Sequence, residues 1–214
     1  MVARGGFHPA PEDGVPELGP GRPARTVILA GDVGGRMWPA FAAARANLAA
    51  ADPLDAWTRA VLADVAERCG AVALFPFGGP PYLPFQRWAR RAEPVAPSPI
   101  GILIHPDWGL WHAYRGALAF RETVALPPPD RRPSPCLTCR GKPCLATCPV
   151  DAFGPAGYDV ARCVEHASGP AGGACAQRGC LARHACPVGA EHRQSAAQAV
   201  FHMAAFLAAH RRPR

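Results

Sequence analysis

The chain has 214 residues, which is enough for one large or two small domains. Hydrophobic residues make up 49% and charged residues 18%, a balance that is typical of globular proteins and excludes a largely disordered chain. The formal net charge of +7 is compatible with a nucleic acid, an acidic redox partner or a membrane surface as partner. No run of arginines is long enough to choose among these partners.

No apolar stretch reaches the roughly 18 residues that a membrane-spanning helix needs. The first residues also lack the apolar segment of an export signal. We therefore expect a cytoplasmic protein with no membrane span. Thiols stay reduced in that compartment, so the cysteines are expected to serve as metal ligands rather than to form disulfides.

The first part of the chain predicts short strands alternating with helices. Residues 1–24 are rich in proline and glycine without apolar periodicity, which indicates an arm that is either flexible or strapped onto the rest of the protein. Apolar runs and apolar residues at intervals of three and four predict strands at 26–30 and 71–75 and helices at 37–49, 53–68 and 85–92. Cys69, at the end of the second helix, is expected to be a small buried apolar residue.

Two further strands, residues 100–105 and 110–120, are predicted around a turn. A stiff Pro-rich segment follows, and a helix is expected from about Ala190 to Arg211, with Arg211 and Arg212 at its negative end. The predicted class is α+β. Its parts are an arm (1–24), an α+β domain (25–126), a linker (127–135), a cysteine-rich module (136–190), and a C-terminal helix with a basic tail (191–214).

Eight of the nine cysteines lie between Cys136 and Cys186. The first four form Cys-x2-Cys-x4-Cys-x3-Cys-Pro, which is close to the bacterial ferredoxin run C-x2-C-x2-C-x3-C-P but two residues longer in its middle gap. The last cysteine is also followed by a proline, Pro187. Eight thiolates are what two [4Fe–4S] clusters require, because each iron takes one cysteine sulfur.

In the ferredoxin pattern the fourth cysteine of the run binds the other cluster. This rule predicts two sets of ligands, each made of three cysteines from one half of the module and one from the other. The first set is Cys136, Cys139, Cys144 and Cys186, and the second set is Cys148, Cys163, Cys175 and Cys180. Two alternatives are disulfides, which need an oxidising compartment, and two four-cysteine zinc sites, since zinc also takes tetrahedral thiolates.

The chain resembles two known families. The segments V-I-L-A-G-D-V-G-G-R-M-W and H-P-D-W-G-L-W-H-A-Y-R-G-A-L-A-F are similar to the cobalamin-processing family defective in methylmalonic aciduria type C. The order of the cysteines, with D-V-A-R-C at Asp159–Cys163, resembles epoxyqueuosine reductase. The resemblance implies a flavin-reductase-like N-terminal domain that binds a corrinoid, followed by a ferredoxin-like module with two [4Fe–4S] clusters and a C-terminal helix.

By this resemblance, Trp108, Trp111 and Arg115 are expected to border a cofactor or substrate cleft. The resemblance is incomplete, because the first domain is shorter than in epoxyqueuosine reductase, and no residue can be assigned as the catalytic acid. His105 and His112 are interpreted as structural hydrogen-bonding residues, with cobalamin ligation or proton delivery as the alternative.

Three functions are compatible with these patterns. The first is an iron–sulfur protein that passes single electrons to a redox partner protein or a small-molecule acceptor. The second is an oxidoreductase of the epoxyqueuosine-reductase type that uses or reduces cobalamin, with a tRNA as a further candidate partner. The third is a zinc-stapled binding module that contacts RNA through its arginines.

Overall fold

The computed structural model describes residues 1–211, and it divides the chain into two compact units. Unit 1 consists of Met1–Pro94 and His112–Arg132, and unit 2 consists of Val95–Trp111 and the chain from Pro133 onward. Helices are mixed with small antiparallel sheets, which confirms the expected α+β class.

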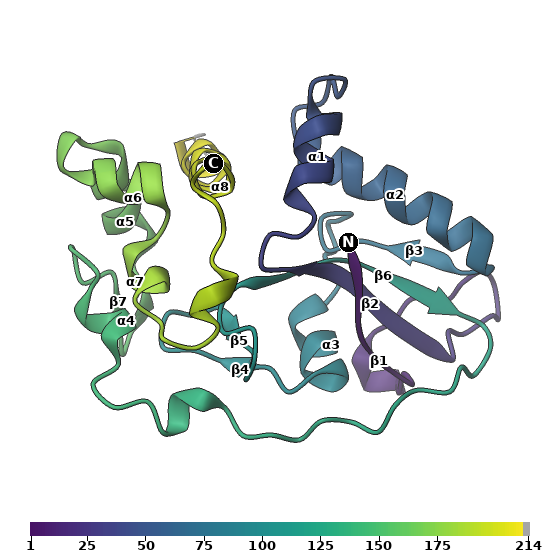
Figure 1. Ribbon diagram of the computed structural model, residues 1–214. Coiled ribbons are helices and arrows are strands. Elements are labelled where there is room, and N and C mark those ends of the chain that lie inside the picture. Colours follow the sequence, from purple (N-terminus) through teal and green to yellow (C-terminus); the bar gives the residue numbers. More distant parts are fainter. Residues whose placement is uncertain (212–214) are drawn as a thin grey trace. The chain divides into compact units, whose positions relative to one another are not determined.

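A four-stranded antiparallel sheet forms the centre of unit 1, with the strand order β1-β2-β6-β3. Its elements are β1 (Val2–Phe7), η1 (a 3-10 helix, Pro11–Asp13), β2 (Thr26–Val33), α1 (Trp38–Arg45), α2 (Pro53–Cys69), β3 (Val72–Leu74), α3 (Phe85–Ala92) and β6 (His112–Phe120). Helix α2 packs on β3 and β6, whereas α3 packs on β1 and β2, so the two helices cover opposite faces of the sheet (Figure 1).

The apolar runs of the sequence explain the centre of this unit. Strand β2 continues the predicted run through Val33, and its Val27 and Leu29 are fully buried between the two helical layers. Helix α2 buries Leu54, Thr58, Leu62 and Ala66, and its C-cap is Gly70, which has the left-handed conformation common at helix ends.

A β-bulge interrupts β6 at Arg115. Ala30 of β2 pairs with Gly116 and Gly31 pairs with Tyr114, so that Arg115 is left without a partner in the ladder. A bulge of this kind turns two successive side chains to the same face. Arg115 is thereby directed to α2, where its guanidinium pairs with Asp55.

Of the two forms predicted for the arm over residues 1–24, flexible or strapped on, its first part has the second. Val2–Phe7 forms β1, which pairs with β2 at the edge of the sheet. Arg4 of β1 is bound to the carboxylate of Glu93, and Asp13 of η1 is bound to Arg91. These contacts join residues that are far apart in the sequence, so local composition gave no sign of them.

Unit 2 is made of short helices and two-residue strands. Its elements are β4 (Ala96–Pro97), β5 (Leu103–Ile104), η2 (Pro135–Leu137), α4 (Pro143–Ala146), β7 (Phe153–Gly154), β8 (Gly157–Tyr158), α5 (Val160–Ser168), η3 (Pro170–Gly172), α6 (Gly173–Arg178), α7 (Leu181–His184), η4 (Ala190–His192) and α8 (Ala196–Arg211). One apolar cluster joins Ile100, Ile104 and Leu110 to the cysteine-bearing segments, and another packs α8 against α5 and α6.

Residues 95–111 are the main departure from the predicted boundaries. The two strands expected at 100–105 and 110–120 do not pair with each other, because β5 pairs with β4 while β6 joins the sheet of unit 1. The turn between them is present as a bridge from His105 to Gly109. The C-terminal helix starts later than expected, at Ala196, and Arg212 lies outside the described residues.

Within residues 1–211, no helix combines the length and the apolar character that crossing a bilayer requires.

Candidate metal centres

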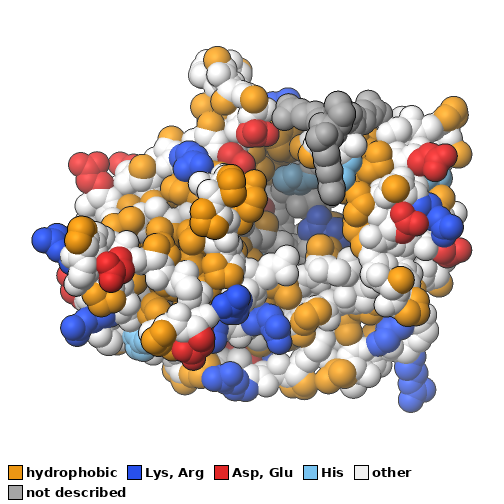
Figure 2. Space-filling view, turned by 180° about the vertical axis from the view of Figure 1, so that it is seen from behind, with side chains coloured by type: hydrophobic (Ala, Val, Ile, Leu, Met, Phe, Trp, Pro, Cys, Tyr) orange, Lys and Arg blue, Asp and Glu red, His pale blue; other side chains and the backbone are white. Residues whose placement is uncertain are grey.

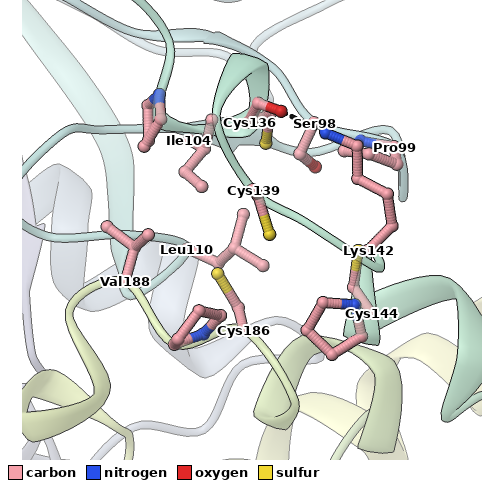
Figure 3. A pocket seen from close by; sticks show the side chains of 13 residues that line it. Ser98, Pro99, Ile104, Leu110, Cys136, Cys139, Lys142, Cys144, Cys186 and Val188 are labelled. Carbon is pink, nitrogen blue, oxygen red and sulfur yellow. Dashed lines mark hydrogen bonds between the residues drawn. The ribbon is translucent and has the colours of Figure 1, made fainter.

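The first set of cysteines lines one small cavity in unit 2. Cys136 lies on η2, Cys139 follows it, Cys144 lies on α4, and Cys186 follows α7. Figure 3 shows their four sulfur atoms directed toward a shared space. The structure therefore brings Cys186 to the three cysteines of the first run, in the grouping that the ferredoxin pattern predicts.

The enlarged gap between Cys139 and Cys144 is taken up by a tight reversal. Gly141 and Lys142 both have positive φ values, 70° and 40°, and α4 begins immediately afterwards. The Nζ atom of Lys142 donates a hydrogen bond to the carbonyl oxygen of Cys136, as the dashed line in Figure 3 marks. The two additional residues thus fold back on the loop, and the three thiols stay together.

The first cavity is closed on the other side by apolar residues. Ile104, Leu110 and Val188 line it together with Pro99 and Pro143. Cys144 and Cys186 are 8% and 7% exposed, and burial is the main reason that the pKa values of their thiols are raised. The backbone N–H groups of Leu145 and Val188 act in the opposite direction, because they donate hydrogen bonds to these sulfurs.

The second set of cysteines lines a larger cavity, also within unit 2. Cys148 follows α4, Cys163 lies on α5, Cys175 lies on α6, and Cys180 directly precedes α7. Helix α8 and the β7–β8 hairpin contribute the apolar side chains Phe153, Met203 and Phe206 to the wall. The volume is about 470 Å³, against about 20 Å³ for the first cavity.

Hydrogen-bond donors are aimed at the second set of thiols. The backbone N–H of Ala152 donates to the sulfur of Cys148 at 3.3 Å. The N–H groups of Ala182 and Arg183 donate to Cys180, which lowers its pKa, although burial raises that pKa more strongly. Tyr158 is hydrogen-bonded to Cys163, and burial together with this contact raises the pKa of the phenol.

The electrostatic coupling between thiols follows the same two sets. The pKa of Cys186 is raised first by burial and then by Cys136, Cys144 and Cys139. The pKa of Cys175 is likewise raised by burial, and the cysteines that act on it are Cys163 and Cys148. No aspartate or glutamate among residues 1–211 lines either cavity. The negative charge of bound thiolates would therefore face lysine, arginine and histidine.

The donor set fits iron–sulfur clusters in its chemistry. Each cavity offers four thiols, backbone N–H groups to the sulfurs, and apolar walls that limit water. The first cavity has space for little more than one water molecule, so the four thiols have to move apart to admit a cluster.

Within residues 1–211, no three Cys, His, Asp or Glu side chains are close enough to hold a single metal ion. In a [4Fe–4S] cluster each sulfur binds a different iron, so the thiolates surround a volume instead of one point.

The three residues expected at a cofactor cleft belong to different units. Trp108 and Trp111 are in unit 2, whereas Arg115 is in unit 1 and is bound to Asp55 and Thr58. Trp108 packs edge-on against His192, and its own ring stacks on His105. His105 accepts backbone hydrogen bonds from Asp107 and Trp108, which agrees with its structural interpretation.

Two side chains at the cavities were missed by the reading of the sequence. Ser98 lines the first cavity, and Arg183 lines the second. The hydroxyl of Ser98 is buried without a hydrogen-bond partner among the described residues. Only the position of Arg183, between two cysteines of the motif, could have drawn attention to it, whereas Ser98 carries no signal in the sequence.

No protein-family model matches this chain, and neither the curated proteins nor the solved structures give a significant match.

Proposed function

We propose that this protein is an electron-transfer protein that binds two [4Fe–4S] clusters, one at each set of cysteines. The observation that carries the proposal is the sorting of eight cysteines into two groups of four around two cavities. The groups are those that the ferredoxin pattern predicts from the order of the cysteines alone.

Such clusters supply reversible one-electron chemistry when they are bound. The chain contributes the rest. The cysteines hold the metal, and backbone N–H groups such as that of Ala152 donate to the sulfurs. Apolar residues of both cavities keep water away, and these hydrogen bonds and the burial set the reduction potential. The electron partner is a redox protein or a small-molecule acceptor.

Unit 2 would on this proposal be a ferredoxin-like module and unit 1 a flavin-reductase-like domain. The order of a sheet domain before a two-cluster module supports a distant relation to epoxyqueuosine reductase. Cobalamin binding remains a prediction of that resemblance. Its measurement is a titration of the iron-loaded protein with cobalamin, in which saturable spectral change would support a corrinoid-linked reductase.

The test of the main proposal is purification without air, followed by quantitation of iron, inorganic sulfide and zinc. We expect about eight irons and eight sulfides per chain. Cys139→Ser and Cys163→Ser should each retain about half of the iron, because each removes one ligand from one set. Cys69→Ser is the matched control, since Cys69 lies on α2 in unit 1 and should leave the iron content unchanged.

Protein without iron and sulfide would contradict the proposal. Two zinc ions per chain in a colourless sample would instead assign the cysteines to a zinc-stapled binding module. For that module to contact RNA, a basic surface would be needed. Figure 2 shows Lys and Arg interspersed with Asp and Glu on the visible face, without a continuous basic patch there.

A further inference from the structure

Arg183 is a cation on the wall of the second cavity. It lies on α7, three residues after Cys180 and three before Cys186. Its Nε and Nη2 atoms donate to the carbonyl oxygen of Leu110 at 3.1 and 2.6 Å, and Nη1 donates to Gln194 at 3.3 Å. The guanidinium also lies 4.5 Å from the ring centre of the buried Trp111. These contacts fix the charge in place.

The contacts of Arg183 are to neutral groups. No carboxylate within residues 1–211 forms an ion pair with it. Arg183 is partly buried, and it lines the cavity that the second set of thiols surrounds. A desolvated charge is costly unless an opposite charge lies nearby. The thiolates that line the same cavity are a source of negative charge for it.

A fixed cation beside a redox group favours the more negative state of that group. Reduction adds one electron to a cluster that its four thiolates already make anionic. Attraction to a cation is stronger in the protein interior than in water, and salt screens it less there than at the surface. Lys142 is held by its hydrogen bond to the Cys136 carbonyl, and it lines the first cavity and not the second.

We propose that Arg183 raises the reduction potential of the second cluster, so that an electron delivered to the module comes to rest on the cluster held by Cys148, Cys163, Cys175 and Cys180. The proposal rests on the proposed function. In the redox step, a low-potential one-electron donor is oxidised and the second cluster takes up the electron. No ligand leaves, and the charge of Arg183 balances part of the added charge.

The experiment is a potentiometric titration of the iron-loaded protein with dithionite, followed by electron paramagnetic resonance. Arg183→Met removes the charge but keeps an apolar side chain against Trp111. We expect one of the two potentials to fall and the other to stay. The same fall should appear in the Cys139→Ser background, where only the second set is complete. Arg178→Met, which removes an exposed arginine on α6 of the same unit, should shift neither potential.

Two more variants keep the result decisive. Arg183→Lys retains the charge and should stay near the wild-type potential, whereas Arg183→Gln removes it and should behave like Arg183→Met. Unchanged potentials in a charge-free variant with full iron content would overturn the proposal. So would loss of half of the iron in both charge-free variants with retention in Arg183→Lys, because the side chain would then be a structural requirement. A wild-type protein without iron would instead refute the proposed function itself.

Discussion

The nine cysteines of this chain occupy two kinds of surroundings. Eight lie in unit 2 and line the two cavities, where burial raises the pKa values of Cys144, Cys175, Cys180 and Cys186. Cys69 is different, because it is exposed at the end of α2. The expectation that it is buried was wrong. Cys69 continues the spacing of the buried Leu62 and Ala66, but it is the last residue of α2, and its side chain is exposed there.

Arg4 provides a test of unit 1 at the scale of one residue. Its side chain is 2% exposed and is bound to the Glu93 carboxylate at 2.7 Å and to the Asp32 carbonyl oxygen at 3.1 Å. Arg4→Ala should lower the free energy of unfolding of unit 1 by about 3 kcal/mol, because it leaves the largely buried Glu93 carboxylate without its cationic partner, although the Tyr114 hydroxyl still donates to it. Urea unfolding followed by tryptophan fluorescence measures the change.

The control for Arg4→Ala is Arg68→Ala. Arg68 pairs with Asp64 on the exposed side of α2, where the two side chains are 69% and 66% exposed. Its loss should cost less than about 0.5 kcal/mol, because water screens the pair. Equal effects of the two substitutions would show that β1 is not held to the sheet by the buried ion pair.

At the scale of elements, two loops of unit 2 cross closely at Gly109. A Cβ atom at this position would lie 1.9 Å from the carbonyl oxygen of Val188, and its φ of +55° also disfavours other residues. The segment that carries Cys186 is thereby held against the turn after β5. Gly109→Ala should push this segment away, and the first cluster should lose its fourth ligand, so that about half of the iron is lost.

Gly70 offers a matched comparison for this substitution. Its φ of +64° is similarly unfavourable for alanine, but no atom lies within 4 Å of the added Cβ, and the residue belongs to unit 1 and lines neither cavity. Gly70→Ala should therefore retain nearly all of the iron, at a conformational cost of about 1 kcal/mol. Iron and sulfide analysis of both variants distinguishes the collision from backbone strain, and full iron content in Gly109→Ala would argue against the proposed support of Cys186.

Elements with strong local patterns were predictable. Helix α3 has its expected bounds, and α2 differs by one residue at its end. Strand β1 was missed because its residues V-A-R-G-G-F show no alternation, and it is ordered by pairing with β2. The partners of β5 and β6 were missed for a related reason. Strand pairing is a long-range property, and adjacent strands in the sequence here join different units.

The grouping of the cysteines was predictable because the Cys-Pro pattern carries information on which sulfur crosses to the other site. The walls of the cavities were not predictable. Ser98 and Leu110 come from a segment far from the cysteines in the sequence, and only the fold brings them to the first cavity. Most arginines lie at protein surfaces, so the residue type of Arg183 did not indicate its position at a cavity. Its contacts with Leu110 and Trp111 depend on the same segment.

At the scale of the whole molecule, the two units should respond differently to removal of iron. Unit 1 has an apolar core of its own, with Phe41 and Trp88 fully buried. The short helices of unit 2 are too brief to be stable by themselves, and metal ligation is coupled to folding. Treatment with a chelator should therefore unfold much of residues 133–187 and leave the sheet of unit 1 in place.

Hydrogen–deuterium exchange read by mass spectrometry measures this difference. Peptides from β2 and β6 should stay protected after the iron is removed, and peptides that contain Cys148 or Cys175 should exchange rapidly. Equal protection of both units after complete loss of iron would show that unit 2 folds without metal.

The return of the polypeptide to unit 1 after residue 111 has a practical meaning for protein engineering. A gene fragment that starts at Pro133 would encode every thiol of the two sets but would omit Ile100, Ile104 and Leu110, which form the apolar cluster behind the first set. The cysteine-rich region therefore cannot be transferred to another protein as one continuous segment. A graft onto another scaffold has to carry both stretches, with a linker in place of residues 112–132.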